Sequence, residues 1–258
     1  SIPAAGRPHP QRVASERSAV RRRDAAAGRS PFHVVVLLEA GMLQGGVSIV
    51  AAVLGGLALA VALYSAPWRT WLGDSERQWV WFGSMALLVV VWSMKAGITP
   101  GLSVRFLLVT ALTLMHGWQL AIVAGALVLV VLSVVGIADW HLYGANLLCM
   151  AVVPALFTAW FHEQVHARLP HNYFIYFFVT TFLGAALAFN LAGLLRVGLI
   201  AVSGNLAATH AGPEYFAILP LMSFGEAVVN GMIVGMAVVY CPRWVMSFDD
   251  RLYLAKGQ

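Results

Sequence analysis

The chain is poor in charge. Only 10% of its 258 residues are charged, whereas soluble domains carry about 25%. Hydrophobic residues make up 60% of the sequence, and the mean hydropathy is +0.79. A soluble domain of this composition would expose large apolar patches to water. The composition therefore predicts a multi-pass membrane protein.

Motifs for nucleotide chemistry and nucleophilic catalysis are also absent. The sequence has no Walker A motif, no glycine-rich phosphate loop, no Ser-His-Asp arrangement and no cysteine pair. Its two cysteines, Cys149 and Cys241, lie in or at the end of apolar runs, which is typical of small apolar packing residues. We therefore expect no enzyme. If the protein transports a substrate, the energy must come from another subunit or from an ion gradient.

Apolar runs long enough to cross a bilayer follow one another along the chain. They predict an all-α transmembrane domain over residues 34–242 with about seven transmembrane helices. The predicted helices cover residues 43–65, 79–96, 102–116, 118–136, 142–161, 174–202 and 215–240. Glycines in the first of them permit close helix contact.

The third predicted helix lies in a broken, polar stretch between Trp92 and Trp118. This stretch holds Lys95, Arg105 and His116, and a Thr-Pro-Gly break at 99–101. A cation at the centre of a membrane helix costs about 2.5–3.5 kcal/mol on insertion scales. Irregular backbone at membrane depth is tolerated only where protein covers it or where it lines a cavity. We therefore predict that the stretch forms one wall of an internal polar site.

The net charge of +5 comes from the N-terminal end of the chain. Residues 1–33 are predicted to be a disordered basic tail, whose seven arginines outnumber Glu16 and Asp24. Such a tail is expected to contact anionic membrane lipids rather than nucleic acid. Residues 243–258 are predicted to be a cytoplasmic C-terminal tail.

The distribution of basic residues among the loops predicts the topology. One set of connections carries all the loop arginines and lysines of the membrane domain: Arg69, Arg77, Arg168, Arg243, Arg251 and Lys256. The connections at 137–141 and 203–214, on the other side, have none. The positive-inside rule then places the C-terminus in the cytoplasm of a bacterial inner membrane. With seven helices the basic N-terminal tail would lie outside, against the same rule, so its side stays open.

A buried polar network is predicted around the last helix. Glu226 and Asn230 are four residues apart and share a helix face. A carboxylate there must be paired or neutral, and Lys95 and Arg105 are the expected partners. Asn146 is expected to add interhelical hydrogen bonds. Two interpretations are open: an ion pair that locks three helices together, or a role in transport.

The histidines offer candidate metal ligands. His116, His141 and His210 are possible ligands for a divalent transition metal, although the topology puts His116 on the side opposite to the other two. His162 and His166 lie within HEQVH, which resembles the zinc-protease motif, and His171 follows closely. A solvated loop at the end of a membrane helix is the favoured interpretation of this second cluster, because no third ligand is evident apart from Glu226.

Several segments, in order, resemble the CbiM-like family, the substrate-capturing membrane components of energy-coupling-factor cobalt and nickel uptake systems. They are APWR (66–69), WSMKAGITPGLSVRFLLVTALTLMHGW (92–118), YGANLLCMAVVP (143–154), RLPHNYFIYFF (168–178), GEAVVNGM (225–232) and WVMSFDDRLYL (244–254). The nearest similarity is to a poorly characterised branch of the family. The resemblance implies about seven helices and, as partners, ATPase and coupling membrane subunits.

The resemblance also implies a metal site, from which this sequence departs. In the family's metal-carrying members the N-terminal amine, a histidine at the second position and a later histidine hold the ion. Here the family's N-terminus aligns near Glu39-Ala40-Gly41, no Met-His pair occurs, and Arg105 stands where the later histidine is expected. The N-terminal metal site is therefore expected to be lost. The alternative function is a non-transporting accessory subunit of a larger membrane complex, and a HEQVH metalloprotease is a third hypothesis.

Overall fold

The computed structural model describes residue 43 and residues 45–94, 96–99, 102–104, 106–204 and 212–248. Within 96–99, 102–104 and 212–218 only the backbone is described. The basic N-terminal tail therefore lies outside the described residues. So do three predicted site residues, Lys95, Arg105 and His210.

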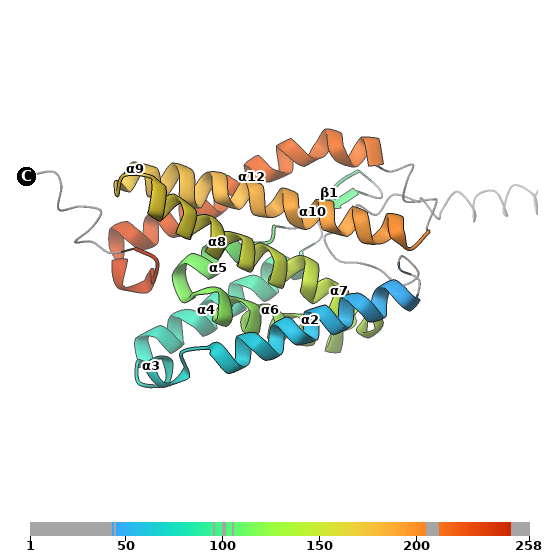
Figure 1. Ribbon diagram of the computed structural model, residues 1–258, viewed down its shortest axis with the longest axis horizontal. Helices are drawn as coiled ribbons and strands as arrows, with labels where there is room; N and C mark the ends of the chain where they lie inside the picture. Colours follow the sequence, from blue (N-terminus) through green and yellow to red (C-terminus); the bar gives the residue numbers. More distant parts are fainter. Residues whose placement is uncertain are drawn as a thin grey trace, which may run out of the picture.

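Helices make up almost all of this part of the chain, and successive stretches run back and forth between two ends of the molecule (Figure 1). Two of the long stretches are composite, because short π-helical turns interrupt them. The helices are α2 Gly45–Ser65, α3 Trp68–Leu72, α4 Ser75–Ser93, α5 Val109–His116, α6 Trp118–Val134, then η1 Trp140–Leu142, α7 Tyr143–Leu147, η2 Leu148–Val152 and α8 Val153–Arg168, then α9 Tyr173–Ile175, η3 Tyr176–Leu183 and α10 Gly184–Val202, and finally α12 Gly212–Tyr240 and η4 Pro242–Trp244.

Among the described residues, four helical stretches are long and apolar enough to cross a membrane: Gly45–Ser65, Trp140–Arg168, Tyr173–Val202 and Leu219–Tyr240. The predicted multi-pass helical membrane protein is confirmed at this level, but the number seven is not. Helix α6 has 17 residues. Helix α4 has 19 residues but opens on a polar turn that includes Glu76 and Arg77.

The predicted helix at 102–116 is wrong in extent. Only Val109–His116 is helical, and its eight residues are too few to cross a bilayer. The residues before it form two short antiparallel strands, β1 Ala96–Thr99 and β2 Leu102–Val104, which are a small local addition to the predicted all-α fold. The predicted break begins at Thr99, the last residue of β1, and its Pro100 and Gly101 lie outside the described residues. Leu102 and Val104 suit a strand as well as a helix, so hydropathy alone cannot separate the two.

The short helix α5 lies at the centre of the bundle. All eight of its residues are buried, and it contacts α6, α8, α10, α12 and η3. The outer helices instead expose large apolar side chains, as expected of surfaces that face lipid. On α2 these exposed side chains include Ile49, Val50, Val53, Leu57 and Val61.

Helices α2 and α7 pack at very short range through glycine. A Cβ atom at Gly144 would lie 2.4 Å from the Ala52 Cα, and one at Gly55 would lie 2.7 Å from the carbonyl oxygen of Gly144. No larger side chain fits at either position without separating the helices. The glycine-rich sequence of α2 thus permits the close contact expected from it.

Candidate functional site

The N-terminus of α5 is capped by the side chain of Glu226, from α12. Phe106, Leu107 and Leu108 precede α5 and supply no capping side chain, and Leu108 adopts a left-handed conformation with φ 55°. The Leu107 amide donates to Oε2 of Glu226 at 2.8 Å, and the Leu108 amide donates to Oε1 at 2.7 Å. Glu226 is 1% exposed. A carboxylate at this position also complements the positive end of the helix dipole.

Asn230, one turn further along α12, completes the cap. Its Oδ1 accepts a hydrogen bond from the Ala111 amide at 2.8 Å, in the first turn of α5. Its Nδ2 donates to Oε1 of Glu226 at 2.9 Å and to the Glu226 carbonyl oxygen at 2.8 Å. The two side chains therefore act as one unit that satisfies three backbone amides inside the bundle.

These contacts change how the predicted polar network is understood. The described hydrogen bonds to the Glu226 carboxylate come from two backbone amides, of Leu107 and Leu108, and from the side-chain amide of Asn230, so the group serves as an acceptor for amide N–H groups. The cationic partners expected from the sequence, Lys95 and Arg105, lie outside the described residues. Asn146 is fully buried in α7.

The C-terminus of α5 is closed by the segment that follows α12. The Met246 amide donates to the Met115 carbonyl oxygen at 3.1 Å, and Ser247 donates to the Leu114 carbonyl oxygen through both its amide (3.1 Å) and its hydroxyl (2.8 Å). Because the Ser247 hydroxyl proton is used there, the Tyr176 hydroxyl is the donor in the 2.7 Å contact between the two hydroxyls. Residues 245–248, predicted as the beginning of a tail, thus pack against the central helix.

His116 is the last residue of α5, and it is 6% exposed. Its Nε2 lies 3.2 Å from the Ser84 hydroxyl oxygen. That hydroxyl donates its proton to the Val80 carbonyl oxygen at 2.8 Å, so Nε2–H of His116 must be the donor to Ser84. In the neutral ring, Nδ1 is then the nitrogen that carries the lone pair.

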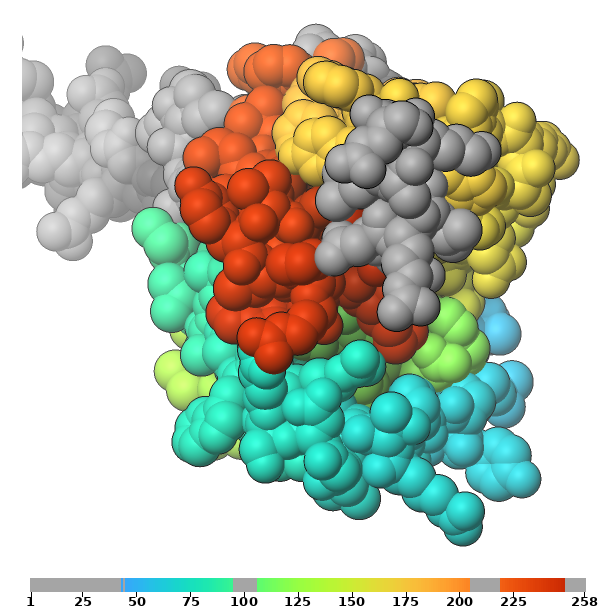
Figure 2. All heavy atoms as spheres, turned by 90° about the vertical axis from the view of Figure 1, so that its left-hand side faces the viewer, coloured from blue at the N-terminus to red at the C-terminus, as the bar shows by residue number. Residues whose placement is uncertain are grey.

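A cavity of about 230 Å³ lies beside His116, at the end of the bundle where α3, α4, the α5–α6 turn and η4 meet. Figure 2 faces this end: the last part of α12 and η4 lies between the α3–α4 region and the α8–α9 region. Its walls combine apolar and aromatic side chains with two arginines. They are formed by Pro67, Thr70, Trp71, Arg77, Val80, Met115, His116, Leu120, Arg243, Trp244 and Met246.

The other predicted metal ligands do not join His116. His141 lies in η1, beyond the far end of α6. The 17 residues of α6 separate the two histidines by about 25 Å of helix, so they cannot bind one ion. Within the described ranges no three His, Cys, Asp or Glu side chains are grouped closely enough to hold a metal ion.

The second histidine cluster lies at the end of α8. The Nε2 atom of His171 is 3.1 Å from Nδ1 and 3.3 Å from Nε2 of His166, and the rings of His162 and His166 are 6.0 Å apart. His166 is exposed and His171 is half-buried. The HEQVH segment therefore ends a membrane helix beside a short connection, and no described acidic side chain completes a protease-like site with it.

Together the apolar helices, the buried polar cap and the short central helix define a multi-pass membrane protein with an internal polar core. Residues 38–244 match the family model CbiM, described as the cobalt uptake substrate-specific transmembrane region. The match covers most of the chain, so the protein belongs to the CbiM family. A search of curated proteins finds no match.

Glu226, Asn230 and His116 were expected from the sequence as buried polar residues, but the capping role and the cavity were not. One signal for the capping role was present: no Ser, Thr, Asp or Asn stands directly before Val109 to cap α5. The cavity had no such signal, because its walls come from three separate parts of the chain.

Proposed function

We propose that the protein is the substrate-capturing membrane component of a multi-subunit uptake system for cobalt or nickel ions. The observation that carries this proposal is the match to the CbiM family over residues 38–244, which include almost the whole helical bundle. The sequence has no nucleotide-binding motif. ATP hydrolysis would therefore be supplied by partner subunits, as in energy-coupling-factor systems.

We further propose seven crossings of the bacterial inner membrane, with the C-terminus in the cytoplasm. In support, Arg69, Arg77, Arg168 and Arg243 belong to α3, the start of α4, the end of α8 and η4, which lie at one end of the bundle (Figure 1). In this topology α5 and the strands before it share the third crossing. The amides of Leu107 and Leu108 would then lie at membrane depth, where the carboxylate of Glu226 satisfies them.

The metal ion is the substrate in this proposal, not a resident cofactor. The arrangement of the family's N-terminal metal site is expected to be lost, so capture must use other ligands. We propose His141, which lies in η1 at the end opposite to the arginines, and His210, which stands between α10 and α12 in the sequence and outside the described residues. His116 lies at the arginine end of the bundle and would not be a ligand at this site.

The test combines uptake with binding. In a bacterium that carries the gene, deletion should lower the accumulation of cobalt or nickel at trace concentration, and the plasmid-borne gene should restore it. The variant with both His141→Ala and His210→Ala should restore much less, whereas His171→Ala, at the arginine end, should restore as well as the native gene. Unchanged accumulation after deletion would refute the proposal.

Purification decides between this function and that of an accessory subunit. The full chain, extracted in mild detergent, should bring ATPase and coupling membrane subunits with it. It should also bind about one equivalent of cobalt or nickel by elemental analysis after dialysis. Metal-free protein held in a larger complex without an ATPase would favour the accessory role instead.

A further inference from the structure

The cavity beside His116 has the properties of a ligand site that metal capture does not require. It is the space of about 230 Å³ between α3, α4, the α5–α6 turn and η4. No ligand for a metal ion gathers there except His116, since no other His, Cys, Asp or Glu stands among its described lining residues. Instead, part of the cavity wall carries cationic side chains, and the rest of the wall is mainly apolar.

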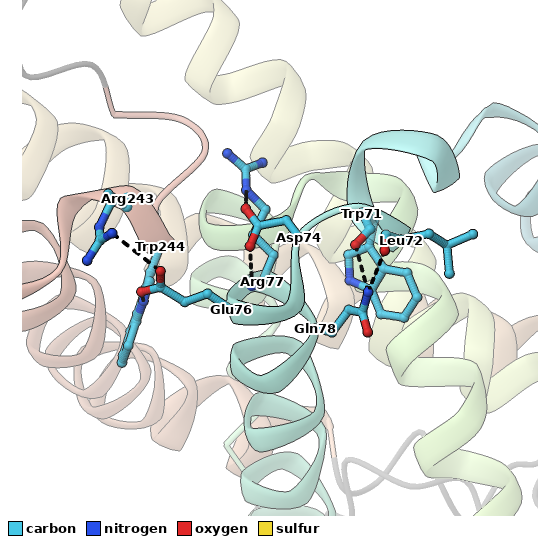
Figure 3. Close-up of polar contacts among 8 residues, drawn as sticks. All are labelled: Trp71, Leu72, Asp74, Glu76, Arg77, Gln78, Arg243 and Trp244. Atoms are coloured by element: carbon cyan, nitrogen blue, oxygen red, sulfur yellow. Dashed lines mark hydrogen bonds and ion pairs between the residues drawn. The ribbon is translucent and has the colours of Figure 1, made fainter.

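Two guanidinium groups, Arg77 and Arg243, line the cavity. Nε of Arg77 lies 3.1 Å from Oδ2 of Asp74, and one Nη of Arg243 lies 3.4 Å from Oε2 of Glu76 (Figure 3). Each guanidinium has five N–H donors, so these contacts leave donors for a further acceptor. Both acidic partners are nearly half exposed, and neither lines the cavity.

Trp71 adds a buried donor without an acceptor. Its indole Nε1 has no hydrogen-bond partner among the described residues, although the atom is buried. The other indole of the cavity wall, Trp244, donates to Oε1 of Glu76 at 2.7 Å. A buried N–H without a partner costs about 1–3 kcal/mol. The atom has almost no accessible surface, so a ligand oxygen in the cavity would remove that cost only after the indole turns toward it.

The remaining walls are apolar. Val80, Leu120, Met115, Met246 and Pro67 supply them. Close by, Leu72 of α3 and Trp79 of α4 are 66% and 77% exposed, as expected where a bundle meets the interface of a bilayer. Basic pockets between membrane helices bind the head groups of anionic lipids.

We propose that this cavity binds a phosphate group, with Arg77 and Arg243 as its cationic contacts and Trp71 as a neutral donor. The source that the position favours is the phosphodiester head group of an anionic membrane lipid, whose glycerol and upper acyl carbons would contact the apolar wall. A soluble phosphate compound is the other source. This proposal does not depend on metal uptake.

The experiment measures the thermal unfolding of the full-length protein in a neutral maltoside detergent. Short-chain phosphatidylglycerol is added in increasing amounts, and parallel series use the matching diacylglycerol, which lacks phosphate, or inorganic phosphate. The midpoint should rise with phosphatidylglycerol and stay unchanged with diacylglycerol. A further rise with inorganic phosphate would identify the phosphate group alone as sufficient, whereas no rise with inorganic phosphate would identify the lipid as the source.

Variants connect the response to the cavity. Arg77→Gln with Arg243→Gln should raise the half-maximal phosphatidylglycerol concentration about tenfold or more. Trp71→Phe keeps the ring and removes the donor, and should raise it about fivefold. The matched control is Arg69→Gln with Arg168→Gln, which removes two exposed charges at the same end of the bundle without touching the cavity, and it should stay within about twofold.

Two results would overturn the proposal. One is the absence of any response to both phosphatidylglycerol and inorganic phosphate in the native protein. The other is an equal loss of response in the cavity variant and in the control variant, because attraction to the basic surface in general would then explain the response. The unfolding midpoint of each variant without ligand shows whether it is folded. If the double variant does not fold, Trp71→Phe carries the test.

Discussion

Replacing Glu226 tests the central feature of the fold. In Glu226→Ala the amides of Leu107 and Leu108 lose their acceptor inside the bundle. An unsatisfied buried amide costs about 1–3 kcal/mol, so the loss should be about 2–6 kcal/mol. In Glu226→Gln, the oxygen that remains can still accept from Leu108 and Asn230, but the new NH₂ group faces the Leu107 amide. One amide is then unsatisfied, for a loss of about 1–3 kcal/mol.

The measurement is thermal unfolding in detergent, followed by tryptophan fluorescence. In a chain of this size, 1 kcal/mol moves the midpoint by about 2–4 °C. We therefore expect a fall of about 2–12 °C for Glu226→Gln and about 4–24 °C for Glu226→Ala. Glu163→Gln, at an exposed position of α8, makes the same chemical change and should stay within about 2 °C of the native protein. A Glu226→Gln midpoint equal to that of the native protein would refute the capping role.

A double-mutant cycle separates capping from the ion pair expected from the sequence. If Arg105 neutralises Glu226, Arg105→Gln should destabilise the native protein but cost little in the Glu226→Gln background. If Glu226 acts mainly on backbone amides, the two costs should add to within about 0.5 kcal/mol. We expect additivity, because the described N–H donors already take three of the about four lone-pair positions of the carboxylate.

Further substitutions test the contacts around the centre. Gly144→Val should separate α2 from α7, because its first side-chain carbon would lie 2.4 Å from the Ala52 Cα. We expect the free energy of unfolding to fall by about 1–3 kcal/mol or more. Gly56→Val, where nothing lies near the added carbon, should be nearly neutral in the same unfolding assay. Ser247→Ala should lower stability by about 1–3 kcal/mol, because it removes two hydrogen bonds of about 0.5–1.5 kcal/mol each, one accepted from the Tyr176 hydroxyl and one donated to the Leu114 carbonyl oxygen. Tyr176→Phe should then add little to Ser247→Ala, and full additivity would contradict the hydrogen bond.

The helices could be predicted wherever a long apolar run is enough to identify a membrane-spanning helix. The apolar run at 118–136 corresponds to α6, and the run at 43–65 corresponds to α2. The stretch at 102–116 could not be predicted in this way. Its residues are mostly apolar, so strand, irregular segment and helix have similar hydropathy, and the left-handed turn at Leu108 has no glycine or asparagine to indicate it.

The sequence predicted which residues form the polar core, but not the groups to which they hydrogen-bond. The spacing of Glu226 and Asn230 places both on one helix face, and both are buried as expected. Their partners are backbone amides 118 and 119 positions earlier in the chain, and no side-chain pattern marks such groups. A cationic side chain was the expected partner because it can be recognised from the residue type, whereas a backbone amide is present at almost every position.

The closure of α5 by distant residues has a consequence for how the chain is made. The hydrogen bonds at its two ends join positions 118 to 133 residues apart, and in each case the later residue lies in α12 or beyond it. A chain still on the ribosome can have completed α5, α6 and α8 while the groups that satisfy α5 have not yet been synthesised. The centre of the molecule is therefore finished last. A premature stop before Ser247 would remove part of the core of the bundle.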